Sequence, residues 1–373
     1  MPLDPSALAT LVHASGRRLV IAVTGGGSQA ISSLLSVPGA SRSIVEAAVP
    51  HSPEALTAWL GARPEQFCDP RTARAMAMAG YWRAQAREPG GGPLVGIGCT
   101  ASLASDRPKQ GAHRVHAAWQ SEAATACISL ELAKGRRSRS EEEALTATLI
   151  LNLVAEACGV AERPPLELFP GEEPHATHFP APADWQNLWA ARALRVAVSG
   201  GGQPSQRVIF PGAFNPLHAG HRQMAEVAAQ LLGERPAFEL SIVNVDKPPL
   251  DFLEIAARAA QFAGGESVWL TRAPRFRDKA RLFPGATFVI GADTAVRIAD
   301  PRYYRGAPEV AAGVIGELAD QGCRFLVYGR VFGGAFRQLD DLALPPQLRD
   351  LCEAVPEVLF RDDVSSTQLR QEG

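Results

Sequence analysis

The sequence predicts two α/β layer domains that follow one another along the chain. Short apolar runs suited to buried strands alternate with segments rich in helix formers in both halves. The length of 373 residues suits two domains better than one. Prolines and acidic residues crowd the stretch between the halves. We therefore expect domains at residues 1–161 and 191–373, joined by an extended, proline-rich linker at residues 162–190.

The first half contains strand and helix signals in alternation. Apolar runs predict strands at residues 18–23, 44–49, 94–99, 113–119 and 126–130. Helices are expected at residues 29–36, 54–60, 70–78 and 141–158. Asp69 is a suitable N-cap for the third of these helices, and Gly159 suits the end of the fourth. The pattern is typical of an α/β layer domain.

The second half repeats this alternation. Strands are predicted at residues 194–198, 208–210, 238–244, 267–271, 287–291, 324–329 and 358–360. Helices are predicted at residues 223–232, 251–262 and 278–282. Repeated strand–helix units predict a Rossmann-like parallel sheet, which binds ligands at the carboxyl ends of its strands.

Composition narrows the class of protein. The formal net charge of −2 argues against a general nucleic-acid binder, which is usually basic. The six cysteines are scattered without the spacing of metal ligands, and they are expected to be buried thiols in a reducing compartment. The N-terminus lacks the pattern of a signal peptide, and no apolar run is long enough to span a bilayer. We expect a cytoplasmic protein with no nucleic-acid or membrane partner.

Residues 207–221 carry the sharpest chemical signal. An apolar strand meets a tight turn rich in proline and glycine, and a helical segment follows at residues 223–232. Free backbone N–H groups and the helix dipole favour an anion at such a helix N-terminus. His218 and His221 flank Gly220 there, so they can donate to phosphate oxygens, and protonated rings would offset growing negative charge.

Three later stretches can contribute to the same site. Gly291 and Asp293 follow a predicted strand, where Asp293 either reads a nucleotide or caps the next helix. Lys247 also follows a strand, and it either reaches the same crevice or is an exposed turn lysine. Ser366 and Thr367 start a helical segment, with Arg370 one turn later. Hydroxyl groups and an arginine in this arrangement form an anion cradle, although a plain N-cap explains the hydroxyls equally well.

These elements together resemble the nucleotidyltransferases with the HxGH signature, and most closely the nicotinamide or nicotinate mononucleotide adenylyltransferases. The resemblance covers about residues 207–370. It rests on Gly212-Ala-Phe-Asn-Pro-Leu-His-Ala-Gly-His221, Gly291-Ala-Asp293 and Val364-Ser-Ser-Thr-Gln-Leu-Arg370. The resemblance implies that the phosphate of a mononucleotide attacks the α-phosphate of ATP and that pyrophosphate leaves. It also implies Mg²⁺ carried by ATP, no metal ligands from the protein, and catalysis by positioning and charge stabilisation.

The resemblance assigns a role to each site residue. The catalytic set would be His218, His221 and Arg370. The nucleotide-binding set would be Gly212, Ala213, Phe214, Lys247, Gly291, Asp293, Ser366 and Thr367. The acceptor comes from the resemblance alone, so an acceptor such as pantetheine phosphate, flavin mononucleotide or a polyol phosphate stays as an alternative, as does CTP in place of ATP.

The first half resembles the C-terminal domain of the competence/damage-inducible CinA family, some members of which are nicotinamide mononucleotide deamidases. The matching stretches are Ala22-Val-Thr-Gly-Gly-Gly27, Ser36-Val-Pro-Gly-Ala-Ser41, Pro70-Arg-Thr-Ala-Arg-Ala-Met76 and Val95-Gly-Ile-Gly98. This chain departs from the family pattern, because Thr24 stands at the position of the proposed catalytic serine and His51 at that of a tyrosine. The loop after the third strand also differs.

Two hypotheses follow for the first half. In one, Thr24 or Ser28 attacks an amide, with Lys109 as the base. In the other, the turn at Gly25 and Gly26 binds a phosphate or only connects a strand to a helix. A CinA-type domain without catalysis would serve nucleotide binding or self-association, and we expect a homo-oligomer built through this half.

Overall fold

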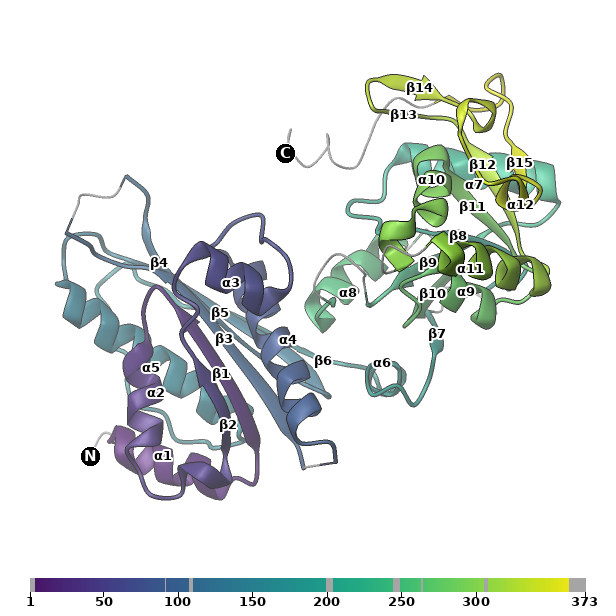
Figure 1. Cartoon of the computed structure of the whole chain (residues 1–373). Helices are drawn as coiled ribbons and strands as arrows, with labels where there is room; N and C mark the ends of the chain where they lie inside the picture. Colours follow the sequence, from purple (N-terminus) through teal and green to yellow (C-terminus); the bar gives the residue numbers. More distant parts are fainter. Residues whose placement is uncertain are drawn as a thin grey trace. The chain divides into compact units, whose positions relative to one another are not determined.

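Two α/β units make up the chain in the computed structural model, which describes residues 4–90, 92–106, 110–198, 204–243, 249–262, 264–304 and 308–361. The first unit contains Met1–Gln186 and the short stretch Asp246–Leu253, and the second contains Asn187–Val245 and Glu254–Gly373. Figure 1 traces the elements of both units along the chain. The α/β fold class predicted from the sequence is confirmed.

The sheet of the first unit has the strand order β2-β1-β3-β4-β5-β6. Its strands are β1 (Arg18–Thr24), β2 (Ile44–Ala48), β3 (Leu94–Ser102), β4 (His113–Ser121), β5 (Ala124–Leu132) and β6 (His175–Pro180). Strands β2, β1 and β3 are parallel, whereas β3 to β6 pair antiparallel in sequence. The carboxyl ends of β1, β2 and β3 therefore meet at one edge, and the predicted residues Thr24, Gly25, Gly26, Ser28 and His51 follow the ends of β1 and β2 there.

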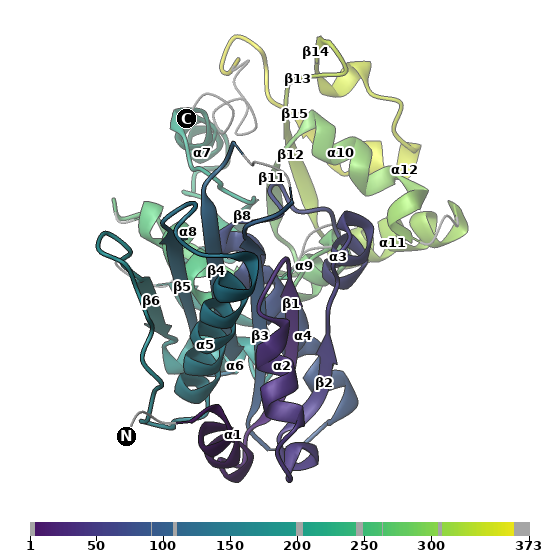
Figure 2. The ribbon, with the colours of Figure 1, turned by 90° about the vertical axis from the view of Figure 1, so that its left-hand side faces the viewer.

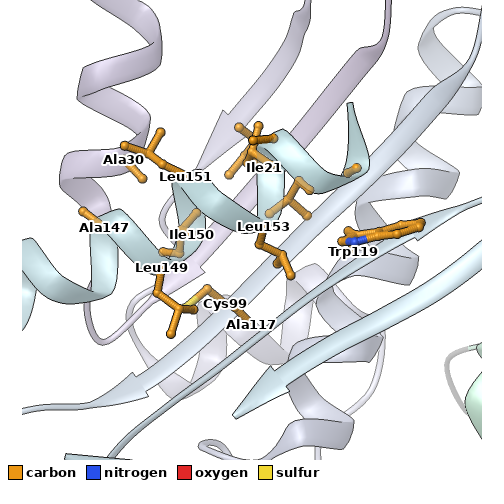
Figure 3. Packing of buried hydrophobic residues seen from close by; sticks show 14 of the residues in the cluster. Ile21, Ala30, Cys99, Ala117, Trp119, Ala147, Leu149, Ile150, Leu151 and Leu153 are labelled. Atoms are coloured by element: carbon orange, nitrogen blue, oxygen red, sulfur yellow. The ribbon is translucent and has the colours of Figure 1, made fainter. Parts of the chain in front are cut away.

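Helices cover both faces of this sheet. They are α1 (Pro5–Ala14), α2 (Ser28–Leu35), α3 (Pro53–Leu60), α4 (Pro70–Arg87) and α5 (Arg139–Ala157), with a 3₁₀ turn at Ala40–Arg42. Figure 2 shows α1, α2 and α5 on one face and α4 on the other. Ile150 and Leu153 of α5 pack on Ile21, Cys99 and Ala117 of the strands, as Figure 3 shows. This apolar contact positions the N-terminus of α5 against the glycine turn described below.

Much of the stretch expected to be a linker is part of the first unit, so this expectation is wrong for residues 164–180. Strand β6 pairs with β5, and Leu166 and Leu168 pack against the core. Glu172 is buried, accepts from Arg137 at 2.6 Å, and accepts from the backbone N–H groups of Ala133 and Phe169. Prolines favour an extended backbone, but an extended segment can still pair with the edge strand of a sheet. Helix α6 (Ala183–Trp189) follows.

The sheet of the second unit has the order β15-β12-β11-β8-β9-β10-β7. Its strands are β7 (Arg195–Val198), β8 (Val208–Pro211), β9 (Ala237–Ser241), β10 (Val268–Thr271), β11 (Thr287–Gly291), β12 (Arg324–Tyr328) and β15 (Cys352–Ala354). All neighbours pair parallel except β7, which is antiparallel to β10. From β10 to β15 the order corresponds to the Rossmann order 3-2-1-4-5-6, which reverses between β8 and β11.

Two apolar layers cover this sheet. The helices of residues 219–349 are α7 (Ala219–Leu232), α8 (Phe252–Ala259), α9 (Phe276–Leu282), α10 (Ala292–Ala299), α11 (Pro308–Asp320) and α12 (Pro346–Arg349), and 3₁₀ turns lie at Ala260–Phe262, Pro301–Tyr304 and Leu339–Asp341. Helix α7 packs on one face through Val227 and Ala228, and α9, α10 and α11 pack on the other. A hairpin of β13 (Arg330–Phe332) and β14 (Ala335–Arg337) follows β12.

The strand predicted at residues 358–360 is wrong. Residues 357–359 form a turn, and Val358 is 91% exposed. The edge of the sheet is instead β15, whose short, half-exposed run of three residues carries too little apolar pattern to predict a strand. In the described part of the chain, no helix has the length and apolarity that crossing a membrane requires.

Candidate active site

The turn between β8 and α7 lies at the point where the strand order of the second sheet reverses. Ligands of open parallel sheets bind at such a point, at the carboxyl ends of the strands. Strand β8 ends at Pro211, and α7 begins at Ala219, directly after His218. Strand β11, the neighbour on the other side of the reversal, ends at Gly291. The fold therefore brings the two predicted nucleotide motifs to one crevice.

The two histidines of this turn form a stacked pair. Their ring centroids are 3.8 Å apart, and the rings are tilted by 33°. The backbone N–H of His218 donates to Nδ1 of His221 at 3.3 Å. Because Nδ1 accepts this bond, the neutral ring of His221 carries its proton on Nε2, which is then a hydrogen-bond donor. Both rings line a small pocket together with Gly220 and Met224 of α7.

His221 is neutral at physiological pH. Burial lowers its pKa to about 3, and the positive charges that His218 and Arg330 can carry add to the effect. The sequence allowed for a protonated ring that offsets phosphate charge. In the structure the neutral ring of His221 has an Nε2–H that can donate, and positive charge beside it comes from other residues of the pocket, such as Arg330.

Arg330 is a site residue that sequence reasoning missed. It follows β12 and Gly329, and it lines the same pocket as the histidines and Gly291. Its Nε lies 3.8 Å from Oδ1 of Asp293. Sequence alone gave no signal for Arg330, because its proximity to His221 arises from the side-by-side pairing of β12, β11 and β8.

Asp293 does not serve as the N-cap of α10. That position belongs to Gly291, and Asp293 lies in the first helical turn. Its Oδ1 atom is buried and has no hydrogen-bond partner among the described residues. A buried carboxylate oxygen without a donor is costly. The position therefore fits a group that receives a hydrogen bond from a ligand better than it fits a helix cap.

The turn is held by aromatic packing in the core and by Gln261 of the 3₁₀ turn Ala260–Phe262. The ring of Phe214, which the resemblance placed along the nucleotide, is 2% exposed and packs on Phe210 and Phe238. Gln261 donates to the carbonyl of Phe214 at 2.9 Å and accepts from the N–H of Leu217 at 2.7 Å. Phe214 thus supports the turn from the core, and its buried side chain lines neither the pocket of the histidines nor the basic pocket described below, in contrast to what the resemblance implied.

A basic pocket of about 230 Å³ opens on the other side of this turn. Gly212 and Ala213 line it, so these two predicted residues of the turn lie at this pocket. Apolar residues of its wall include Leu240, Phe276 and Ile298. The cationic residues of its wall are Arg258, Arg275, Lys279 and Arg297, and no described residue of the wall is an aspartate or glutamate. We call this cavity the basic pocket.

Five predicted site residues lie outside the described residues. They are Lys109, Lys247, Ser366, Thr367 and Arg370. The described residues contain no group of three or more histidine, cysteine or acidic side chains placed to hold a metal ion.

The glycine turn of the first unit, Gly25–Ser28, is filled by a carboxylate of the same unit. Glu143 of α5 accepts from the N–H of Gly27 at 2.8 Å, the hydroxyl of Ser28 at 3.0 Å and the N–H of Gln29 at 3.3 Å. Burial by itself would raise the pKa of the Glu143 carboxyl, but these donors and Arg139 outweigh it and lower that pKa. Glu143 therefore takes the place that a phosphate would occupy at this helix N-terminus.

The glycines of this turn are needed for packing. Gly25 has φ of +80°, and a Cβ there would lie 2.0 Å from the carbonyl oxygen of Ala101. Gly27 has φ of +87°, and a Cβ there would meet Ile150 at 2.2 Å. Gly26 lies between them under Leu103. The glycine-rich sequence is explained by close approach of neighbouring elements, without a ligand.

Of the proposed nucleophiles of the first unit, Ser28 contacts the Glu143 carboxylate, whereas Thr24 has no side-chain base as a hydrogen-bond partner among the described residues. Thr24 is buried at the end of β1, beside Thr100 of β3. His51 is exposed after β2, and the next residue, Ser52, caps α3 by accepting from Ala55 at 3.1 Å. No hydrogen bond among the described residues joins the side chains of Thr24, Ser28 and His51.

Comparisons with known proteins give different matches for the two halves of the chain. A model of the cytidylyltransferase-like family matches residues 209–263, which include the turn and both histidines. Together with the strand order, this match confirms a nucleotidyltransferase-like domain with a Rossmann-like fold in the second half. A search of the curated proteins found no match to this chain.

Solved structures similar to the first half belong to the CinA group that its sequence resembles. The competence/damage inducible protein CihA from Agrobacterium tumefaciens is 16% identical, and the match covers 43% of this chain and 98% of that one, with a TM-score of 0.33. A CinA superfamily protein from Escherichia coli is 16% identical, with coverage of 42% and 88% and a TM-score of 0.32. A competence or damage-inducible protein from Enterobacter asburiae is 17% identical, with coverage of 42% and 98% and a TM-score of 0.33. Likeness at this level carries no conclusion about activity.

Proposed function

We propose that the second unit transfers the adenylyl group of ATP to the phosphate of a pyridine mononucleotide, giving the dinucleotide and pyrophosphate. The observation that carries this proposal is the His218–His221 pair at the start of α7, at the strand-order reversal of a Rossmann-ordered sheet. The match to cytidylyltransferase-like proteins supports nucleotidyl transfer as the reaction class. The pyridine acceptor is supported by sequence resemblance.

The site suits this chemistry without a protein nucleophile. A phosphate oxygen of the acceptor attacks the α-phosphorus of ATP, and the bond from that phosphorus to the bridging oxygen breaks to release pyrophosphate. His221 donates a hydrogen bond from its neutral Nε2–H to a phosphate oxygen, and Arg330 supplies positive charge at the same pocket. Mg²⁺ enters with ATP and neutralises part of the phosphate charge. Catalysis is then positioning combined with charge stabilisation.

The basic pocket supports an acceptor that is small and phosphorylated. It adjoins the turn through Gly212 and Ala213, so a ligand in it lies beside the phosphate site. Four cationic residues in its wall attract an anion, while Leu240, Phe276 and Ile298 can pack on an uncharged ring.

Acceptor profiling tests the proposal directly. The full chain, Mg²⁺ and ATP or CTP labelled at the α-phosphate are incubated with nicotinamide and nicotinate mononucleotides, pantetheine phosphate, flavin mononucleotide and a polyol phosphate. We expect labelled dinucleotide and pyrophosphate with ATP and a pyridine mononucleotide. Transfer to another acceptor alone would contradict the acceptor class. No transfer at all by folded protein would contradict nucleotidyl transfer.

For the first unit we infer a role other than amide hydrolysis. Glu143 already occupies the N–H groups that would bind a substrate phosphate, and its lowered pKa makes it a poor base for Ser28. We expect no release of ammonia from nicotinamide mononucleotide. Release that disappears in a Thr24→Ala variant would contradict this inference and support the deamidase hypothesis.

A further inference from the structure

A buried ion pair lies at the basic pocket of the second unit. Nζ of Lys279 is 2.6 Å from Oε2 of Glu239, and it also donates to the carbonyl of Ala273 at 2.8 Å. Thr271 donates its hydroxyl to the same carboxylate. Lys279 is 6% exposed, whereas Glu239 and Thr271 are fully buried. These bonds hold Lys279 in one position in the wall of the pocket.

Stability does not explain this pair. Moving two charges out of water costs several kcal/mol, and apolar residues of similar volume are often at least as stable in such places. An ammonium group has three N–H donors. Two of those of Lys279 are used by Glu239 and Ala273, and no described residue receives the third. The arrangement therefore presents a fixed, partly unsatisfied cation to whatever occupies the pocket.

The other cations of the basic pocket divide into two kinds. Arg258 is committed within the protein, because it pairs with Glu254 at 2.7 Å and donates to the carbonyl of Ala213 at 3.0 Å. Arg275 and Arg297 are exposed at the wall. Because the described residues of the wall include cations and no carboxylate, the potential of the pocket favours a ligand with more than one negative group.

We infer that Lys279 is a specificity-determining residue that binds a carboxylate of the acceptor, at the end of the acceptor remote from its phosphate. The phosphate must lie at Gly212 and Ala213, beside the histidines. The ring then packs on Phe276, and its substituent meets Lys279. The acceptor is therefore a mononucleotide whose base carries a carboxylate rather than a carboxamide. This inference rests on the proposed function and adds the charge state of the acceptor.

The test compares kcat/KM for nicotinate and nicotinamide mononucleotides at saturating ATP. The unmodified chain should prefer the carboxylate form at least tenfold. Lys279→Met combined with Glu239→Gln removes both charges, so no unpaired charge is left buried, and it should bring the preference close to one while the KM for ATP stays unchanged. Arg281→Ala is the matched control, since Arg281 lies on the same helix, pairs with Glu317 and does not line the pocket.

If the paired variant does not fold, the exposed change Arg275→Ala provides the second measurement, and it should reduce the preference at least threefold. Turnover of both mononucleotides with equal or reversed preference overturns the inference and leaves the proposed function in place. A preference that survives in the folded paired variant, or in Arg275→Ala if the paired variant does not fold, also overturns it. Turnover of neither mononucleotide overturns the proposed function itself.

Discussion

The molecule contains two turns of similar design with different contents. In each unit a buried strand runs into a turn with glycine and then into a helix N-terminus, at Gly25–Ser28 and at residues 212–218. The first turn is filled by Glu143, whose carboxylate receives its N–H groups. The second is lined by His218 and His221 and opens to pockets on both sides. A strand, a turn and a helix N-terminus thus form an anion site, and a residue far away in the sequence determines whether a ligand can bind there.

The largest effect is expected at His221. His221→Ala removes the N–H donor of the open turn and should lower kcat by about 10²–10³-fold, as loss of one preorganised donor typically does. Steady-state adenylyl transfer measures this. His175→Ala, an exposed histidine of β6, is the matched control and should leave kcat unchanged. Equal activity of the two variants would show that the turn is not the catalytic site.

Glu143→Ala should remove the carboxylate that fills the glycine turn Gly25–Ser28 of the first unit. It leaves the N–H of Gly27 buried without its acceptor, so the free energy of unfolding should fall by about 1–3 kcal/mol. Denaturant unfolding followed by circular dichroism measures the loss. Inorganic phosphate should raise the stability of this variant more than that of the parent chain, because the anion site of the first unit is vacant only in the variant. Equal stabilisation of both proteins would refute the comparison.

Arg330→Ala should reduce adenylyl transfer less than His221→Ala does. Arg330 adds positive charge beside the phosphates but is partly exposed, so we expect a decrease of about tenfold in kcat/KM for ATP. Arg337→Ala is the control in the same hairpin. Arg337 is the register partner of Arg330 but does not line the pocket of the histidines. A matching decrease in both variants would assign the effect to the hairpin rather than to the charge.

The last prediction concerns pH. His221 has a pKa of about 3 in the folded chain, below the usual value near 6.5 in an unfolded chain. The unfolded state therefore binds more protons below pH 6.5, and the contribution of neutral His221 to stability is lost as the pH falls from about 6.5 towards 3. The slope is at most about 1.4 kcal/mol per pH unit. His221→Asn should flatten the dependence in this range, and an unchanged slope would disprove the lowered pKa.

Most of the strands could be predicted because their signal is local. The apolar runs at residues 18–23, 208–210 and 287–291 are too short and too apolar for anything but buried strands, and the structure places strands there. The segment at residues 164–180 was predicted wrongly for the opposite reason. Its prolines predict an extended chain, but whether that chain forms a strand depends on the edge of β5, with which it pairs.

The candidate site shows the same division. The sequence by itself determined the α/β class, the turn before α7 and the two histidines, since these depend on neighbours within about fifteen residues. Tertiary structure alone decided that Glu143 closes the glycine turn from 116 residues away, that Arg330 joins the histidines, and that Lys279 is fixed by Glu239 in the basic pocket. It also decided that His221 is neutral. Burial and charge depend on which elements pack together, and a sequence pattern does not contain that information.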